Sequence, residues 1–133
     1  MKTLRVLLLF AAVIALNSCA VEEEIDNTKL LTQKTWTYDS VSGYDDFTNQ
    51  FLDAFLTSST YKFDEDGTYT ATLLGQSAGG GTWSFNSDET KITVGANGSD
   101  PETWTIITLS ETTLKVSGED DSALDGTYTL TFK

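Results

Sequence analysis

The sequence predicts an all-β fold, an eight-stranded antiparallel up-and-down barrel with one short α-helix after the first strand. Apolar residues alternate with threonine, serine and lysine in eight short runs, which is the period of two that strands show. Clusters of glycine, asparagine and aspartate separate the runs and are short enough for hairpin turns. A sheet with one apolar face and this many strands satisfies its edges best by closing. A β-sandwich needs the same alternation with longer crossovers and is the alternative.

Composition restricts the size and the chemistry of the protein. A chain of 133 residues has the length of one domain. It contains no histidine, so it lacks the side chain best suited to proton transfer near neutral pH, which is also the commonest metal ligand. The net charge is −12, and such a surface repels nucleic acid and anionic lipid. We therefore expect no enzyme activity, no metal, no cofactor and no nucleic-acid partner.

The first 18 residues have the anatomy of a secretory signal peptide. Lys2 and Arg5 give a positive start, and Val6 to Leu16 is an unbroken apolar run of eleven residues. This run is too short to span a bilayer, which takes about 20 residues in helical form. Residues 1–18 are therefore predicted to be a leader that is removed on export.

The lone cysteine lies where cleavage of this leader would occur. Leu16, Asn17, Ser18 and Cys19 resemble the lipobox of bacterial lipoproteins. The resemblance implies that Cys19 is acylated, by palmitate or a similar chain, and that the protein is anchored to the outer membrane, at its periplasmic face or on the cell surface. Such an anchor contributes about 0.8 kcal/mol per buried methylene whatever the protein's charge. The alternative is an ordinary secretory cleavage site beside a chance cysteine.

Residues 19–31 are predicted to be an acidic linker between this anchor and a folded domain at residues 32–133. The three glutamates from Glu22 to Glu24 follow the cysteine closely. They resemble the acidic export signal of surface-displayed lipoproteins in some Gram-negative bacteria. They equally suit a solvated tether that like-charge repulsion keeps extended.

The predicted strands place their large apolar residues on one face, and mostly threonine on the other, so one face is buried and the other is wet. In one run Ile107 and Leu109 have the opposite parity, which predicts a bulge or an extra covered patch there. Gly75 to Gly81 is predicted to be a flexible hairpin connection. The eight runs are Thr35 to Val41, Thr60 to Phe63, Thr68 to Leu74, Thr82 to Asn86, Lys91 to Gly95, Thr103 to Ser110, Thr113 to Ser117 and Thr127 to Phe132.

One segment after the first strand has a helical pattern instead. Apolar residues fall at positions 47, 51, 52, 55 and 56, and Asp45 or Asp46 can cap the N-terminus of the helix. This stripe must cover something apolar. We expect the helix to close one end of the barrel as a plug, or to form a movable lid over a ligand-binding mouth.

Several segments of the chain resemble the lipocalin-like domains that are common in small bacterial lipoproteins. The resemblance extends from Leu30 to Lys133 and implies an eight-stranded barrel that binds a small apolar molecule. Lys34 stands where a typical lipocalin has glycine, and no arginine follows Arg5, so only a lysine can pack over the first tryptophan. The segments that carry the resemblance are Trp36, "YKFDEDGTYTATL" at Tyr61 to Leu73, "GGGTWSF" at Gly79 to Phe85 and "WTIITLSETTLKVS" at Trp104 to Ser117.

The interior of the barrel is the expected ligand site, because eight strands leave room for side chains or for one small ligand. The candidates carry hydroxyl or indole groups on the inner face, and these groups need partners when they are buried. The expected ligand is small and hydrophobic or amphipathic. If side chains fill the core instead, we expect a protein-interaction or accessory module of a cell-surface complex. The candidate ligand-binding residues are Tyr38, Tyr61, Trp83, Trp104 and Tyr128.

Overall fold

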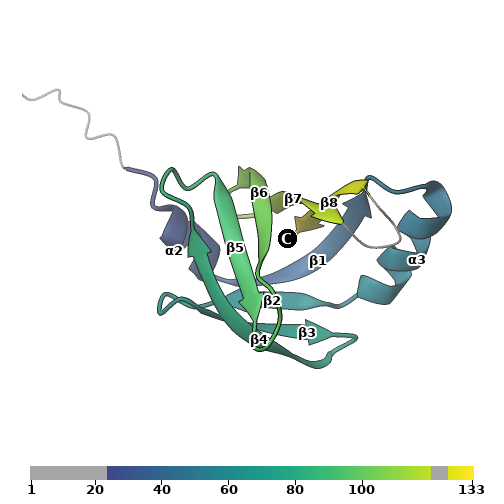
Figure 1. Ribbon diagram of the computed structural model, residues 1–133, viewed down its shortest axis with the longest axis horizontal. Helices are drawn as coiled ribbons and strands as arrows, with labels where there is room; N and C mark the ends of the chain where they lie inside the picture. The colour runs from purple at the N-terminus through teal and green to yellow at the C-terminus, as the bar shows by residue number, and fades with distance from the viewer. Residues whose placement is uncertain (1–23, 121–125) are drawn as a thin grey trace, which may run out of the picture.

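The computed structural model describes residues 24–120 and 126–133, which form a closed barrel of eight antiparallel strands (Figure 1). Each strand pairs with its neighbours in the sequence, and the last strand returns to pair with the first. The predicted fold class is thereby confirmed, including the helix after the first strand. The elements are α2 (Asn27–Thr32), β1 (Thr35–Ser42), α3 (Asp46–Leu56), β2 (Thr60–Phe63), β3 (Thr68–Leu73), β4 (Gln76–Phe85), β5 (Lys91–Ala96), β6 (Glu102–Leu109), β7 (Leu114–Asp120) and β8 (Gly126–Phe132).

The six-residue helix α2 was not predicted, and it covers one end of the barrel. Asp26 caps its N-terminus by accepting a hydrogen bond from the backbone nitrogen of Lys29. Leu31 is fully buried, and its carbonyl accepts a hydrogen bond of 2.8 Å from the indole of Trp36 on β1. The packed part of the chain therefore begins inside the segment predicted as a linker, before residue 32. The predicted leader and Cys19 lie outside the described residues.

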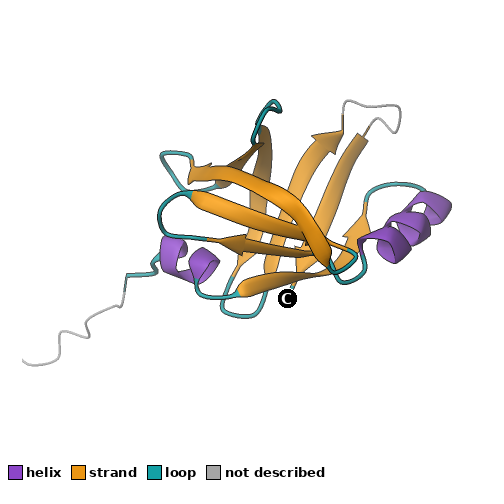
Figure 2. Cartoon of the chain, turned by 90° about the horizontal axis from the view of Figure 1, so that it is seen from below, coloured by secondary structure: helices purple, strands orange, loops and turns teal. Residues whose placement is uncertain are grey.

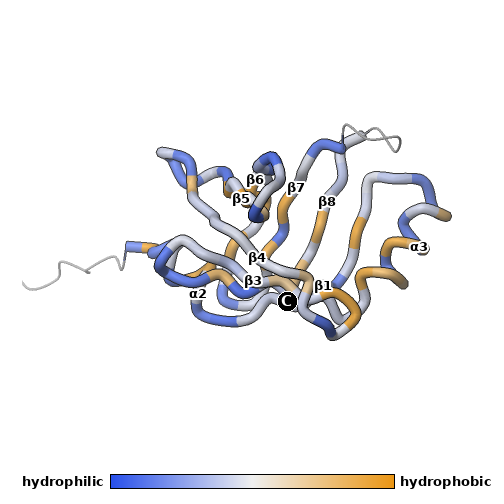
Figure 3. Tube along the Cα trace, turned by 60° about the horizontal axis from the view of Figure 1, so that its bottom comes forward, coloured by the Kyte–Doolittle hydropathy of each residue, from blue (hydrophilic) through white to orange (hydrophobic). Residues whose placement is uncertain are grey.

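Alternation along the strands brings the predicted apolar residues together in one core. The hydropathy colouring shows apolar residues recurring along β1, β7 and β8 (Figure 3). The fully buried side chains belong to helix α2 and to strands β1, β2, β5, β7 and β8, so the lumen is filled over most of its length. The largest of them are Trp36, Phe63, Phe132, Leu31, Ile92, Leu114 and Val116.

Three register shifts interrupt the described ladders of the barrel, in β1, in β6, and in β3 between Ala71 and Thr72 where it pairs with β4. The predicted irregularity in β6 is confirmed, because the register with β7 shifts between Ile106 and Thr108. A second shift, between Tyr38 and Ser40 of β1, was not predicted. It turns Val41 inward against the simple alternation, and Val41 is 7% exposed.

From Gln76 on, the glycine-rich segment is strand rather than flexible connection, which corrects the prediction for Gly75 to Gly81; only Gly75 lies in the turn, with a φ of 77°. Strand β4 begins at Gln76, and Gly81 pairs with Tyr69 of β3 and with Ala96 of β5. A Cβ atom at Gly81 would lie 1.9 Å from the carbonyl oxygen of Gly95. The glycine therefore serves a close approach of two strands, not a turn.

Helix α3 lies at the end of the barrel opposite α2 (Figures 1 and 2). The predicted cap is confirmed, since the Asp45 carboxylate accepts from the backbone nitrogens of Phe47 and Thr48. The Asp53 carboxylate attaches the helix to β1 by accepting from the Tyr38 hydroxyl at 2.6 Å and from the backbone nitrogen of Val41 at 3.1 Å.

The predicted apolar stripe of α3 divides into two faces. Leu52 and Leu56 pack against the core. Phe47, Phe51 and Phe55 form a row on the outside and are 78%, 60% and 44% exposed. Within the described residues, no helix is long and apolar enough to cross a membrane.

Candidate functional site

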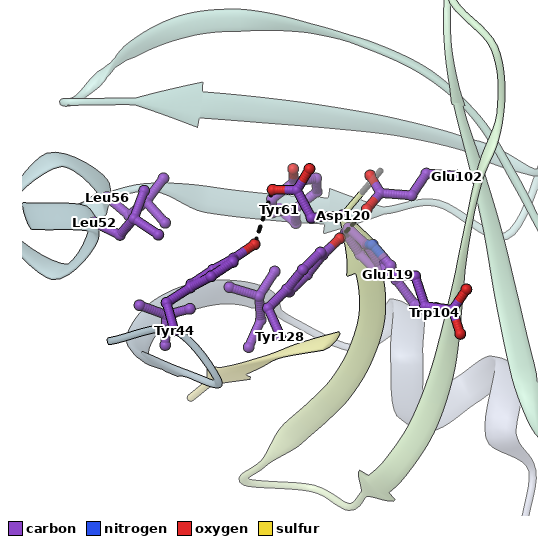
Figure 4. A pocket seen from close by; sticks show the side chains of 11 residues that line it. Tyr44, Leu52, Leu56, Tyr61, Glu102, Trp104, Glu119, Asp120 and Tyr128 are labelled. Carbon is purple, nitrogen blue, oxygen red and sulfur yellow. Dashed lines mark hydrogen bonds between the residues drawn. The ribbon is translucent and has the colours of Figure 1, made fainter. Parts of the chain in front are cut away.

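A pocket of about 380 Å³ opens to solvent at the α3 end of the barrel. Leu52 and Leu56 of α3 lie at one side of it, and Glu102 and Glu119 lie at the other (Figure 4). The pocket is therefore amphipathic, with an aliphatic wall facing an acidic one. Its lining consists of Val41, Tyr44, Leu52, Leu56, Tyr61, Glu102, Trp104, Glu119, Asp120, Tyr128 and Leu130.

The inner end of the pocket is aromatic. Tyr61 of β2 and Trp104 of β6 meet across the lumen with ring centroids 5.6 Å apart and planes at 78°. Tyr61 also contacts Phe132 edge-on, at 5.6 Å, and stacks on Phe63 at 6.1 Å. This cluster separates the open pocket from the filled core on the α2 side, because Phe63 and Phe132 are buried there.

Two parallel tyrosines carry the polar part of the wall (Figure 4). Tyr44, in the connection between β1 and α3, and Tyr128 of β8 stack with centroids 6.1 Å apart and an angle of 20°. The Tyr44 hydroxyl donates to the Asp120 carboxylate at 3.0 Å. The Tyr128 hydroxyl donates to the Glu102 carboxylate. Both phenol protons are therefore directed to carboxylates that line the pocket.

The pocket is electronegative. Glu102, Glu119 and Asp120 line it, and no lysine or arginine is among its described lining residues. Burial and the hydrogen bond to Asp120 raise the pKa of Tyr44 to about 12, and burial with the nearby negative charge raises that of Tyr61 to about 12. Both phenols are neutral at physiological pH. No group of three His, Cys, Asp or Glu side chains within the described residues is arranged to hold a metal ion.

The indole of Trp104 differs from the other two indoles of the chain. Trp36 donates to the carbonyl of Leu31 at 2.8 Å, and Trp83 donates to the carbonyl of Asp64 at 2.9 Å. The Trp104 residue is only 2% exposed. Its indole nitrogen is buried and has no hydrogen-bond partner in the described structure. In Figure 4 this nitrogen is turned toward Tyr128, within the pocket lining. An unmatched buried donor is costly and indicates a place for an acceptor.

The barrel wall is open beside this indole. The register of β6 with β7 begins at Thr105 and Ser117, so the first residues of β6 extend beyond the ladder. A second hollow of about 430 Å³ lies there and shares Glu102 and Glu119 with the pocket. The side chain of Tyr128 lies over Gly118 of β7, where a Cβ atom would be 2.5 Å from the hydroxyl oxygen. Glycine at this position lets the tyrosine reach across to Glu102.

The structure brings together three of the five candidate residues. Tyr61, Trp104 and Tyr128 line the pocket. Tyr38 lies outside its lining and donates to Asp53, and the Trp83 indole donates to the backbone of the turn after β2. Neither side chain contributes to the pocket described here.

Sequence reasoning missed the acidic side and the helical side of the pocket. Glu102, Glu119 and Asp120 lie at strand ends, where acidic residues are expected to be hydrated. Tyr44 lies in a connection, and no alternation pattern extends to it. The helical stripe did contain Leu52 and Leu56, but it did not indicate which part of the stripe faces the barrel.

Comparison with known proteins agrees with the architecture. A family model described as a lipocalin-like domain matches residues 23–116. The crystal structure of a DUF4847 family protein from Bacteroides vulgatus superposes with a TM-score of 0.56 and 10% identity, covering 80% of this chain and 96% of that one. No curated protein matches the chain. The Lys34 ammonium nitrogen lies 5.0 Å from the centroid of the Trp36 ring, so a lysine packs over the first tryptophan. The chain belongs to the lipocalin-like domain family.

Proposed function

We propose that the protein is a lipid-anchored lipoprotein that binds a small amphipathic ligand at the mouth of its barrel. The observation that carries the proposal is the open pocket, whose aliphatic and aromatic walls enclose a buried indole donor without a partner. Binding pockets typically combine apolar walls with a few oriented polar groups. The core beyond Tyr61 is filled, so the ligand occupies the mouth and not the whole lumen.

The position of the pocket suits an anchored protein. The described chain starts beside α2, and the pocket lies at the opposite end, beside α3 (Figure 1). A lipid on Cys19 would hold the α2 end nearer the membrane and leave the mouth facing away from it. We propose the outer membrane as the location, at its periplasmic face or on the cell surface.

Replacement of Cys19 by alanine is expected to release the protein from the membrane. The net charge of −12 gives no electrostatic attachment to anionic lipid, so the acyl chains provide the binding. Membrane fractionation with intact-mass measurement checks this, with Ser18→Ala as the matched control. An unmodified Cys19 in the wild-type protein would contradict the anchor.

Binding, not catalysis, is the activity that we propose. The chain has no histidine, so a serine or threonine nucleophile would lack the usual base. Two of the three pocket carboxylates accept hydrogen bonds from tyrosine hydroxyls. Such groups orient a ligand and need no covalent chemistry.

Leu56→Trp is expected to reduce the small molecule that purifies with the protein, because the larger side chain enters the pocket from α3. Native mass spectrometry of the full chain, extracted gently from its source, measures this loss. Phe55→Trp is the matched control, since Phe55 is the adjacent, 44% exposed residue on the outer face of the helix. Repeated absence of any bound small molecule from the wild-type protein would contradict the proposal.

The row of exposed phenylalanines favours a second candidate function. Phe47, Phe51 and Phe55 form an apolar surface on α3, and the rings of Phe51 and Phe55 stack at 6.2 Å. Contiguous exposed apolar surface is typical of protein-interaction sites. An accessory module of a surface complex would keep a protein partner, and no small molecule, in the same native mass experiment.

A further inference from the structure

The acidic side of the pocket offers hydrogen-bond acceptors, whereas the Tyr61 hydroxyl and the Trp104 indole at its inner end are donors. The carboxylates of Glu102 and Glu119 accept hydrogen bonds only, and so does that of Asp120. The hydroxyls of Tyr44 and Tyr128 give their protons to two of these carboxylates and present the remaining lone pairs. A ligand that satisfies such a wall must bring donors of its own.

The charge of the wall has the same consequence. Three acidic side chains and no described basic one line a pocket whose interior is aromatic. A fatty acid or another anionic amphiphile would place its head group against like charge. A protonated amine there would gain charge-assisted hydrogen bonds, and it could also contact the tyrosine rings.

Trp104 adds one requirement of the opposite kind. Its indole nitrogen is a donor that is turned toward Tyr128 of the pocket lining (Figure 4). The nitrogen is buried and has no hydrogen-bond partner in the described structure, and the residue is 2% exposed. A hydroxyl or carbonyl oxygen on the ligand would satisfy it. The acidic side and the indole thus call for a positive donor group and an acceptor on one molecule.

We propose that the ligand is a small organic amine, protonated at neutral pH, with an oxygen acceptor close to the nitrogen and an apolar chain. The ammonium group lies toward Glu102, the oxygen accepts from Trp104, and the chain lies against Leu52 and Leu56. This inference rests on the proposed function, because it assigns a ligand class to the same pocket.

Four probes with the same eight-carbon chain test the ligand class by isothermal titration calorimetry on the full chain: 1-aminooctan-2-ol, octylamine, octan-1-ol and octanoate. The amino alcohol is expected to bind tightest and octanoate weakest, with octylamine about tenfold tighter than octanoate. If octan-1-ol or octanoate binds as tightly as octylamine, the amine assignment is wrong and the pocket proposal stands. If none of the four binds and the native protein carries no small molecule, the proposed function fails as well.

Two substitutions locate the interactions. Glu102→Gln is expected to lower the ratio of octylamine to octan-1-ol affinity about fivefold, as loss of one partly solvated charge contact does. Glu65→Gln, an exposed turn residue, removes the same charge outside the pocket and is expected to leave this ratio unchanged. An equal effect of the two would show general attraction to an acidic surface and overturn the assignment.

Trp104→Phe keeps an aromatic ring and removes only the indole donor. It is expected to weaken 1-aminooctan-2-ol about threefold to tenfold, the effect of one hydrogen bond, and to change octylamine less. If both amines lose the same affinity, the indole contributes only packing. The proposed ligand would then need no oxygen acceptor, and that part of the proposal would be wrong. Thermal melting of each variant confirms that the barrel has folded.

Discussion

Replacement of Trp36 by alanine is expected to lower the free energy of unfolding by about 3–5 kcal/mol, as removal of a buried tryptophan does. Trp36 has no solvent exposure, and its indole hydrogen bond to the Leu31 carbonyl joins α2 to β1. The substitution leaves a cavity and an unpaired buried carbonyl at the same end of the barrel. Since a domain of this size is stable by only about 5–15 kcal/mol, much of the total would be lost.

Urea unfolding followed by far-ultraviolet circular dichroism measures this change. Trp36→Phe retains the ring and loses the hydrogen bond to Leu31, so we expect a smaller loss of about 1–2 kcal/mol. Leu74→Ala is the control for an apolar residue on the surface, because Leu74 is 56% exposed, and it should change stability little. A loss below about 1 kcal/mol for Trp36→Ala would show that α2 and Trp36 do not stabilise the barrel.

The barrel could be predicted because short sequence patterns, within each strand and between neighbouring strands, specify it. Alternation along each strand and glycine or aspartate between strands specify hairpins, and hairpins in sequence order close into this topology. The helix α2 was missed because its six residues follow an acidic run, and only the burial of Leu31 against Trp36 marks them as part of the domain. The predicted strand at Thr82 was too short, because glycine in a sequence usually indicates a turn. In the structure Gly81 instead allows two strands to approach closely.

The candidate site was only partly predictable, for a related reason. Parity correctly placed Tyr61, Trp104 and Tyr128 on the inner face, and the structure then brings them to one pocket. The alternation along a strand shows which face a residue lies on but not how far along the barrel axis it lies. It therefore could not distinguish these three pocket residues from Tyr38, whose hydroxyl donates to Asp53 of α3. The acidic wall combines residues from distant parts of the chain, and no local pattern connects Glu102 with Asp120.

Alkaline pH is expected to destabilise the barrel, because folding raises the pKa values of several tyrosines. Burial raises the pKa of Tyr38 further than any other, and the hydrogen bond to Asp53 adds to this effect. Burial is also the main cause for Tyr61 and Tyr44, whose pKa values rise to about 12, and for Tyr69, whose pKa is raised as well. An unfolded tyrosine ionises at about pH 10.

The sign follows from proton binding. Below about pH 10 these phenols are neutral in both states and their contribution to stability is complete. Above it the unfolded chain loses its protons first, so the free energy of unfolding falls as pH rises toward the folded pKa values. For Tyr61 alone, a gap of about two pH units corresponds to about 2–3 kcal/mol. The other buried phenols add to this loss.

Urea unfolding measured at a series of pH values from about 8 to 12 tests this, with tyrosinate absorbance reporting ionisation in the folded state. Tyr61→Phe keeps the ring contacts with Trp104 and Phe132 and removes the ionisable group. Its unfolding free energy should therefore fall less steeply with pH than that of the wild type. A constant unfolding free energy across the range would mean that the phenols ionise in place, which requires water to reach Tyr61 and the inner end of the pocket to be wet. A steep fall that Tyr61→Phe reduces would instead place this hydroxyl in a dry environment, where an apolar part of a ligand is also stabilised.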